Sequence, residues 1–172
     1  MKDYLILYWN KGGNVEKAAK LILQNLGKEN TDICDLQSFP IHEINNYKLI
    51  IAGGATVGAQ NWEEAKADNQ WNLFFNQLKD KHISLSKVAL FGLGDQLLYP
   101  NNFVDHLSNL YEGFSALNAK LIGKWPIETY TFTESTAIEN KHFLGLALDN
   151  DRQAHLSPER IAQWVKQLKK EI

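Results

Sequence analysis

The chain has 172 residues, of which 44% are hydrophobic and 22% are charged, and its formal net charge is −2. This hydrophobic content excludes a disordered chain, and the length suits one domain, residues 1–172, with a sizeable core. The near-neutral charge leaves no basic footprint for nucleic acid. The apolar run at residues 4–9 is far too short to span a bilayer, so we expect no membrane segment.

The cysteine and histidine content narrows the possible chemistry further. A single cysteine, Cys34, excludes an intrachain disulfide, and no charged and apolar leader opens the chain, so we expect a cytoplasmic protein. The histidines lack the spacing of a metal site, and no metal is expected. They are His42, His82, His106, His142 and His155.

Strand and helix patterns alternate along the chain. The first helix is predicted because apolar residues such as Val15, Ala18 and Ile22 recur at spacings of three and four. The predicted strands are 4–9, 31–36, 49–52, 88–91 and 120–123, the last resuming at 143–148 after an interruption at 125–142. The predicted helices are 15–26, 69–78, 102–117 and a final one from Ser157 to the end of the chain.

This alternation predicts βαβ units and therefore an α/β fold. Right-handed crossovers and five strands give a doubly wound parallel sheet inside a three-layer α/β/α sandwich. In such sheets, ligands bind at the carboxyl ends of the strands. Three glycine-bearing loops are expected there, at residues 10–15, 53–60 and 92–102.

The loop at 92–102 carries groups that suit a planar ligand. Glycines just past a strand, among them Gly94, let the backbone come close to a ring. Asp95 and Asn102 offer polar contacts, and Tyr99, which we expect to be exposed, offers an aromatic face. We expect Pro100 and Asn101 to open the following helix.

Several segments resemble the long-chain flavodoxin family in order and spacing, over nearly the whole chain. The interrupted fifth strand is what marks the long-chain branch. The matching segments are Gly92-Leu93-Gly94-Asp95-Gln96, Tyr99-Pro100, Asn102-Phe103, Trp125-Pro126, 143–149 and Glu159-Arg160-Ile161. This resemblance implies a flavodoxin-like fold and a carrier that binds flavin mononucleotide (FMN) non-covalently.

The phosphate loop is degenerate relative to the family pattern Thr-x-Thr-Gly-x-Thr. Gly13 matches, whereas Asn10, Gly12 and Val15 stand where the pattern has hydroxyl groups. Backbone N–H groups at a helix N-terminus still suit a phosphate. Asn10 and Asn14 add amide donors, and Lys11 adds a positive charge. The alternative is an ordinary glycine-rich turn that binds no ligand.

The loop after the third strand is also degenerate. The family pattern is Thr-Trp-x-x-Gly, and this chain reads Ala55-Thr56-Val57-Gly58, so Val57 replaces the tryptophan that stacks on the flavin. About five extra residues follow. Trp62 in this insertion either replaces the missing ring or packs on the surface.

The third loop keeps the family residues best. By resemblance, Tyr99 stacks on the outer face of the flavin, while Asp95 and Asn102 lie at its pyrimidine edge, next to Gly94. Asp149 matches a carboxylate close to the ribityl chain.

The resemblance implies an electron carrier that is not an enzyme. Its expected partners are a flavin reductase upstream and an electron-accepting enzyme downstream, and the expected state is a monomer. Two alternatives stay open. One is a flavodoxin-fold protein with weak or lost FMN binding that acts as an interaction module or binds another small anion. The other is an FMN-dependent quinone or nitro reductase, although the sequence shows no catalytic residue that would support it.

Overall fold

A computed structural model describes residues 2–55, 69–79, 81 and 83–172. Its main sheet is parallel, in the order β2-β1-β3-β4-β5, and β9 also pairs with β4. The strands are β1 (Tyr4–Tyr8), β2 (Thr31–Asp35), β3 (Leu49–Ala55), β4 (Lys87–Leu93), β5 (Lys120–Ile122) and β9 (Leu146–Leu148).

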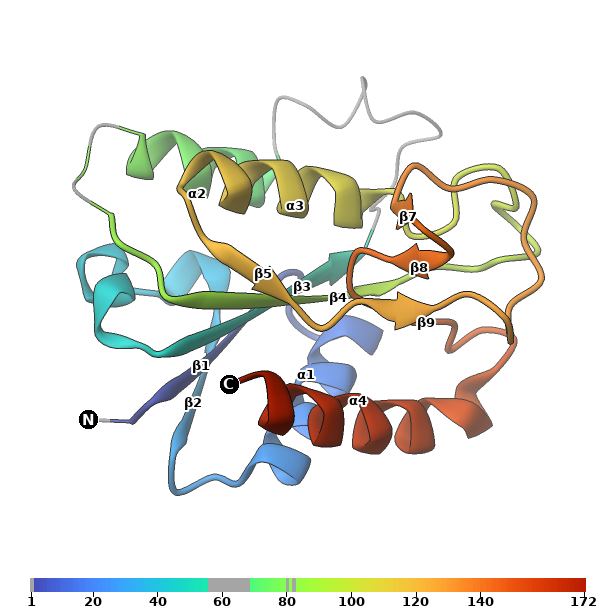
Figure 1. The fold of residues 1–172 in the computed structure, drawn as a ribbon, viewed down its shortest axis with the longest axis horizontal. Coiled ribbons are helices and arrows are strands. Elements are labelled where there is room, and N and C mark those ends of the chain that lie inside the picture. Colours follow the sequence, from blue (N-terminus) through green and yellow to red (C-terminus); the bar gives the residue numbers. More distant parts are fainter. Residues whose placement is uncertain (1, 56–68, 80, 82) are drawn as a thin grey trace.

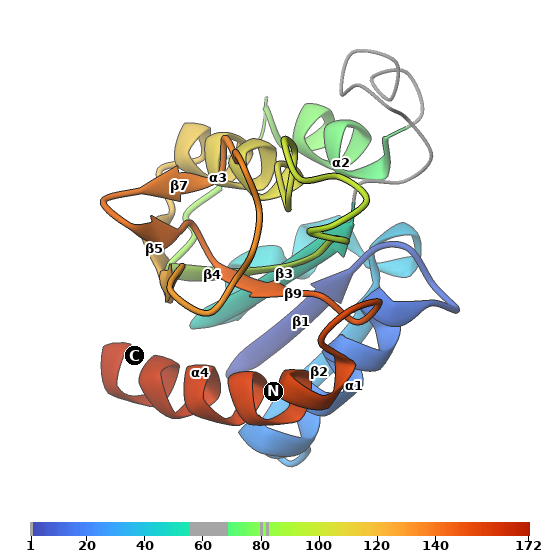
Figure 2. The same ribbon diagram turned by 90° about the vertical axis from the view of Figure 1, so that its right-hand side faces the viewer.

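In the described part of the chain, four α-helices cover the two faces of this sheet. In Figures 1 and 2, α2 and α3 lie on one face and α1 and α4 on the other, which confirms the predicted three-layer α/β/α sandwich. The helices are α1 (Asn14–Leu26), α2 (Gln70–Leu78), α3 (His106–Ala116) and α4 (Ser157–Glu171). Short 3₁₀ helices are η1 (Leu36–Ser38), η2 (Ile41–Asn46) and η3 (Ala154–Leu156).

The fifth strand is interrupted, as the sequence predicts. β5 pairs with Lys87–Ala89 of β4, and β9 pairs with Phe91–Leu93 farther along the same strand. Between them lies a small antiparallel sheet in the order β6-β8-β7. Its strands are β6 (Trp125–Pro126), β7 (Ile138–Glu139) and β8 (His142–Phe143).

The prediction that the strand resumes at 143 was wrong by three residues, because Phe143 belongs to the small sheet. Gly145 lies between the two sheets and crosses β4 closely. A Cβ atom there would lie 2.3 Å from the backbone oxygen of Leu90. Only a glycine allows this approach, and the main sheet continues beyond it at Leu146.

Strand β3 continues through Gly53 and Gly54, so the loop predicted from residue 53 begins later. Gly53 lies opposite Phe91 of β4, and a Cβ on it would be 2.1 Å from the Phe91 ring. The ring therefore covers the space that a side chain would take. This packing explains a glycine inside a central strand.

Helix α3 begins at His106, four residues later than predicted, and Pro100 and Asn101 lie in turns. Val104 adopts φ of +51°, in the left-handed region that a β-branched residue rarely enters. A right-handed helix cannot pass through this residue. The stretch from Asp95 to Asp105 instead forms successive turns, with Tyr99 N donating to Asp95 O and Asn102 N to Tyr99 O.

The described residues offer neither a membrane span nor a metal site. None of the helices there has the length and apolar content that crossing a bilayer requires. Likewise, no three His, Cys, Asp or Glu side chains of this part of the chain are grouped so as to hold a metal ion.

His106 makes the stability of the fold depend on pH. Its ring is buried against Gly92 at the start of α3, and burial lowers its pKa to about 4, although a hydrogen bond with the Gly54 backbone opposes the shift. The unfolded chain therefore binds a proton below about pH 6.5 that the folded chain binds only near pH 4. The contribution of His106 to stability is therefore fully present above about pH 6.5, the pKa of the histidine in the unfolded chain. It is lost as the pH drops from there toward 4.

We expect the free energy of unfolding to fall by about 2 kcal/mol between pH 7 and pH 5 on account of His106 alone. Urea unfolding at the two pH values should show this loss in the wild type and in His142→Gln, whose histidine is exposed. In His106→Gln the loss should shrink by that amount. An equal loss in all three proteins would contradict a buried, neutral His106.

Candidate functional site

The loops that follow β1, β3, β4 and β9 start side by side. Tyr8 is in register with Gly53, Ala55 with Leu93, and Leu93 with Leu148. The amide of Trp9 also donates to the Gly53 carbonyl at 3.1 Å. These loops therefore share the edge of the sheet that the carboxyl ends of β3, β4 and β9 form, at the right of Figure 1.

The loop at residues 10–15 presents open backbone at the N-terminus of α1. Gly12 has φ of +87°, which favours glycine, and Gly13 is the N-cap residue. Apart from its chain neighbours, no atom of the described residues lies within 4 Å of the position a Cβ would take on either glycine. Asn10 is half-buried and Lys11 is exposed, while Asn14 is the first residue of the helix.

Val15 does not offer its side chain to this loop. It is buried in the core on the inner face of α1, with Ala18 and Ile22. A threonine hydroxyl, the group that the family pattern places at this position, therefore has no counterpart here. Any contribution of Val15 to a ligand comes from its backbone.

Glu16 is a feature of this loop that the sequence reasoning missed. Its carboxylate accepts a hydrogen bond from the Gly12 amide at 2.6 Å and pairs with Lys20 at 2.7 Å. The hydrogen bonds from Lys20 and Gly12 lower the pKa of Glu16. The turn is thus already arranged around an oxygen anion, and a phosphate there would share or take over the Gly12 N–H. An acid in the first turn of a helix was the available signal.

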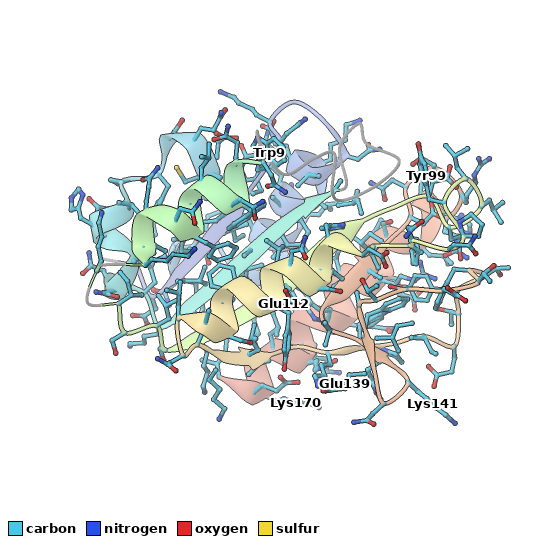
Figure 3. All side chains as sticks on the ribbon, turned by 90° about the horizontal axis from the view of Figure 1, so that it is seen from above. Trp9, Tyr99, Glu112, Glu139, Lys141 and Lys170 are labelled. Carbon is cyan, nitrogen blue, oxygen red and sulfur yellow. The ribbon has the colours of Figure 1, made fainter. Side chains whose placement is uncertain are left out.

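Tyr99 lies on the loop after β4 and is half exposed, as predicted. The exposed fractions of Leu97, Leu98 and Tyr99 are 56%, 61% and 51%, so three large apolar side chains in succession face solvent. Figure 3 shows Tyr99 toward one end of the molecule. An aromatic side chain this exposed is available to stack on a planar ring.

The polar residues predicted on this loop bind other parts of the chain. The Asp95 carboxylate accepts from the amides of Leu97 at 3.0 Å and Leu98 at 2.9 Å, and it pairs with Arg152. Asn102 donates to Asp105 at 3.0 Å. Their side chains therefore shape the loop.

The pKa of Asp95 reflects these partners. Burial raises it, but the hydrogen bonds from Arg152 and from the backbone of Leu98 and Leu97 together hold the pKa below its usual value. Asp95 is accordingly a carboxylate at neutral pH. Because the ionised form accepts these bonds more strongly than the neutral acid, protonation of Asp95 would weaken the hold on the loop.

Gly94 and Asp149 also have structural reasons for their identity. A Cβ on Gly94 would lie 3.0 Å from the Phe103 ring and 3.2 Å from the Val104 amide, so tight packing accounts for the glycine. Asp149 is fully buried and accepts from the backbone amides of Gln96, Asp151 and Arg152. It joins the loop after β9 to the loop after β4.

The structure brings the residues of the first and third loops to one edge of the sheet. Ala55 is the half-buried last residue of β3. The predictions for Thr56, Val57, Gly58 and Trp62 lie outside the described residues. Sequence reasoning also missed Arg152, and its long distance in sequence from Asp95 left no signal for the pair.

Comparison with known proteins shows which family the chain belongs to. The sequence pattern of the family described as flavodoxin matches residues 6–164. The chain is 34% identical to a flavodoxin of Synechocystis over 95% of this chain and 94% of the relative. It is 34% identical to flavodoxin 1 of Escherichia coli K12 over 97% and 93%.

A solved structure extends this similarity to three dimensions. The crystal structure of a Fusobacterium nucleatum flavodoxin bound to flavin mononucleotide superposes with a TM-score of 0.86 at 27% identity, covering 100% of this chain and 99% of that one. The family pattern, the relatives and this structure agree over nearly the full length. The chain therefore belongs to the flavodoxin family.

Proposed function

We propose that this flavodoxin binds FMN at the carboxyl edge of its sheet and carries electrons one at a time, at low potential. The observation that best supports this proposal is the meeting of two features at one edge. These are the open Gly12–Gly13 backbone at the start of α1 and the exposed ring of Tyr99 after β4. As a flavodoxin, the chain is an electron-transfer protein and not an enzyme.

The residues present fit the two ends of FMN. The turn at 10–15 has backbone donors at a helix N-terminus, with Asn10, Lys11 and Asn14 at its rim, which suits a phosphate. Tyr99 suits the isoalloxazine ring, and we place Gly94, Asp95 and Asn102 beneath that ring as the frame of the loop. Asp149 completes the frame. We keep Ala55, Thr56, Val57 and Gly58 as proposed contacts on the opposite side of the ring.

These proposed contacts separate the role of FMN from the role of the chain. FMN supplies the reversible one-electron chemistry, and the chain binds it, orients it and shields it from water. Tyr99, with Leu97 and Leu98 beside it, gives the ring an apolar flank.

Partners and location complete the proposal. An electron carrier works between a donor and an acceptor, so we propose a flavin reductase upstream and an electron-accepting enzyme downstream. The single cysteine supports a cytoplasmic location, and the monomer is the proposed state. The alternative of a flavodoxin fold without FMN is not favoured, because the chain belongs to the flavodoxin family, Gly12 and Gly13 leave room beside the backbone, and Tyr99 remains exposed.

The test is a visible absorbance spectrum of the purified protein, followed by titration of the FMN-free form with FMN and with riboflavin, which lacks the phosphate. We expect a flavin band and tighter binding of FMN than of riboflavin. Absence of a band together with no quenching of flavin fluorescence at tens of micromolar would refute FMN binding.

The Tyr99→Ala substitution should weaken FMN binding by about 5- to 30-fold, since a stacked aromatic contact contributes about 1–2 kcal/mol. Tyr99→Phe is the matched control, because it keeps the ring and loses only the hydroxyl group. Riboflavin should lose affinity by a similar factor, since the ring contact does not involve the phosphate. Equal FMN affinity in Tyr99→Ala and wild type would exclude Tyr99 as the stacking residue.

A further inference from the structure

Arg152 links two loops at the edge of the sheet that are 57 residues apart in sequence. We propose that Arg152 is a positioning residue for the cofactor: it fixes the loop that carries Tyr99 and balances the charge of Asp95 beside the flavin. The charge part of this inference rests on the proposed function. The positioning part concerns the chain alone.

The contact between Arg152 and Asp95 is two-pronged. Nε of Arg152 lies 3.1 Å from Oδ1 and 3.2 Å from Oδ2 of Asp95, and Nη2 lies 3.0 Å from Oδ2. The Asp95 side chain is only 10% exposed, whereas that of Arg152 is 45% exposed. A planar guanidinium held by both carboxylate oxygens is the geometry that most restricts an ion pair.

Asp95 transmits this restraint to Tyr99. Its side chain receives the amides of Leu97 and Leu98, and its backbone oxygen receives the amide of Tyr99 at 2.9 Å. The backbone amides of three successive loop residues therefore donate hydrogen bonds to one aspartate. A shift of the carboxylate would release Leu97 and Leu98, the two residues that lead directly into Tyr99.

The backbone of Arg152 is held in place by a second carboxylate, that of Asp149. Its backbone amide donates to Oδ1 of Asp149 at 2.9 Å, while Oδ2 of Asp149 receives the Gln96 amide at 3.0 Å. Both loops are thus bound to the same buried carboxylate through their backbones and to each other through the Arg152 side chain. This closed arrangement explains how an exposed Tyr99 can keep one position.

The pair also sets the local charge. Among the residues that the structure describes, Arg152 is the one cation that forms a salt bridge with Asp95. Without it, the largely buried negative charge of Asp95 would lose its salt-bridge partner, four residues before Tyr99. Fully reduced FMN carries a negative charge on its ring near neutral pH, so an unbalanced carboxylate nearby would oppose reduction.

The first test uses the FMN-free protein and amide hydrogen exchange. In Arg152→Gln, the amides of Leu97 and Leu98 should exchange about three- to tenfold faster than in wild type, because the carboxylate that receives them is less restrained. Lys170→Gln is the matched control, since it removes the same charge at the far end of α4, where Lys170 is exposed (Figure 3). Unchanged exchange in Arg152→Gln would overturn the positioning role, whatever the protein binds.

The second test uses the FMN complex and its reduction potential. Arg152→Gln should weaken binding of reduced FMN about three- to tenfold more than binding of oxidised FMN, which lowers the two-electron midpoint potential by about 15–30 mV. Arg152→Lys should restore the potential, because it keeps the charge. A potential equal to that of Lys170→Gln, or a lysine variant as low as the glutamine variant, would overturn the charge role.

The two tests separate this inference from the proposed function. If wild type binds no FMN, the proposed function and the charge role fall together, while hydrogen exchange still decides the positioning role. If wild type binds FMN and the Arg152 variants match their control, only the inference fails.

Discussion

Replacing Asp149 with alanine is expected to lower the free energy of unfolding by about 3–5 kcal/mol and to weaken FMN binding severely. The carboxylate is fully buried and receives three backbone amides, from Gln96 at 3.0 Å, Asp151 at 3.1 Å and Arg152 at 2.9 Å. A buried N–H group without an acceptor costs about 1–3 kcal/mol. The amides of Asp151 and Arg152 are only partly buried, so water can replace part of their lost hydrogen bonds. The total loss is therefore smaller than three full penalties. Both loops of the proposed site lose their common anchor.

Urea unfolding of the FMN-free protein measures the first effect, and FMN titration measures the second. Asp151→Ala is the control, because it removes a neighbouring carboxylate that is exposed. Asp149→Asn should fall between the two, since its amide oxygen can still accept while its NH₂ group faces donors. A change within 1 kcal/mol of wild type in Asp149→Ala would show that solvent replaces the carboxylate at these amides.

The order of elements and the three-layer fold could be predicted from the sequence because local patterns carry them. The spacing of Val15, Ala18 and Ile22 fixes the buried face of α1 without knowledge of its neighbours. Short apolar runs between helices likewise predict central parallel strands. The ends of the elements could not be predicted where a contact across the fold decides them. At Gly53, for example, the Phe91 ring extends β3 through a glycine pair that reads as a loop.

The candidate site shows a similar limit. Its position at one edge of the sheet follows from the topology, and the exposure of Tyr99 was predicted. The roles of polar side chains such as Asp95 were harder to predict, because a carboxylate near a ligand loop can bind either the ligand or the loop. The partner that decides between them, Arg152, lies 57 residues away. The contacts of these polar side chains with FMN stay predictions. The Arg152 and Asp149 variants test them.

The Trp164→Ala substitution should reduce stability by about 4–5 kcal/mol. Trp164 of α4 is fully buried, and its Nε1 donates to the Gly123 carbonyl at 2.7 Å. Gly123, with φ of +80°, ends the first part of the interrupted strand, and a Cβ on it would lie 3.0 Å from the same Nε1. The indole therefore fills the core and holds the chain where the insertion begins. Urea unfolding measures the loss, and Trp164→Phe should lose about 1–2 kcal/mol, because it keeps most of the packing and loses the hydrogen bond.

The Trp164 and Asp149 variants separate stability from cofactor binding. Trp164→Ala changes the core beneath α4 and leaves both ligand loops anchored, so the folded protein should bind FMN within about twofold of wild type. FMN in excess should then raise the unfolding free energies of wild type and Trp164→Ala equally, because stabilisation by a ligand depends on its concentration and affinity alone. Asp149→Ala should gain little from the same FMN concentration, since its affinity is lost. If Trp164→Ala lost FMN affinity as severely as Asp149→Ala, the site would depend on the whole core and not on the two carboxylates that fix its loops.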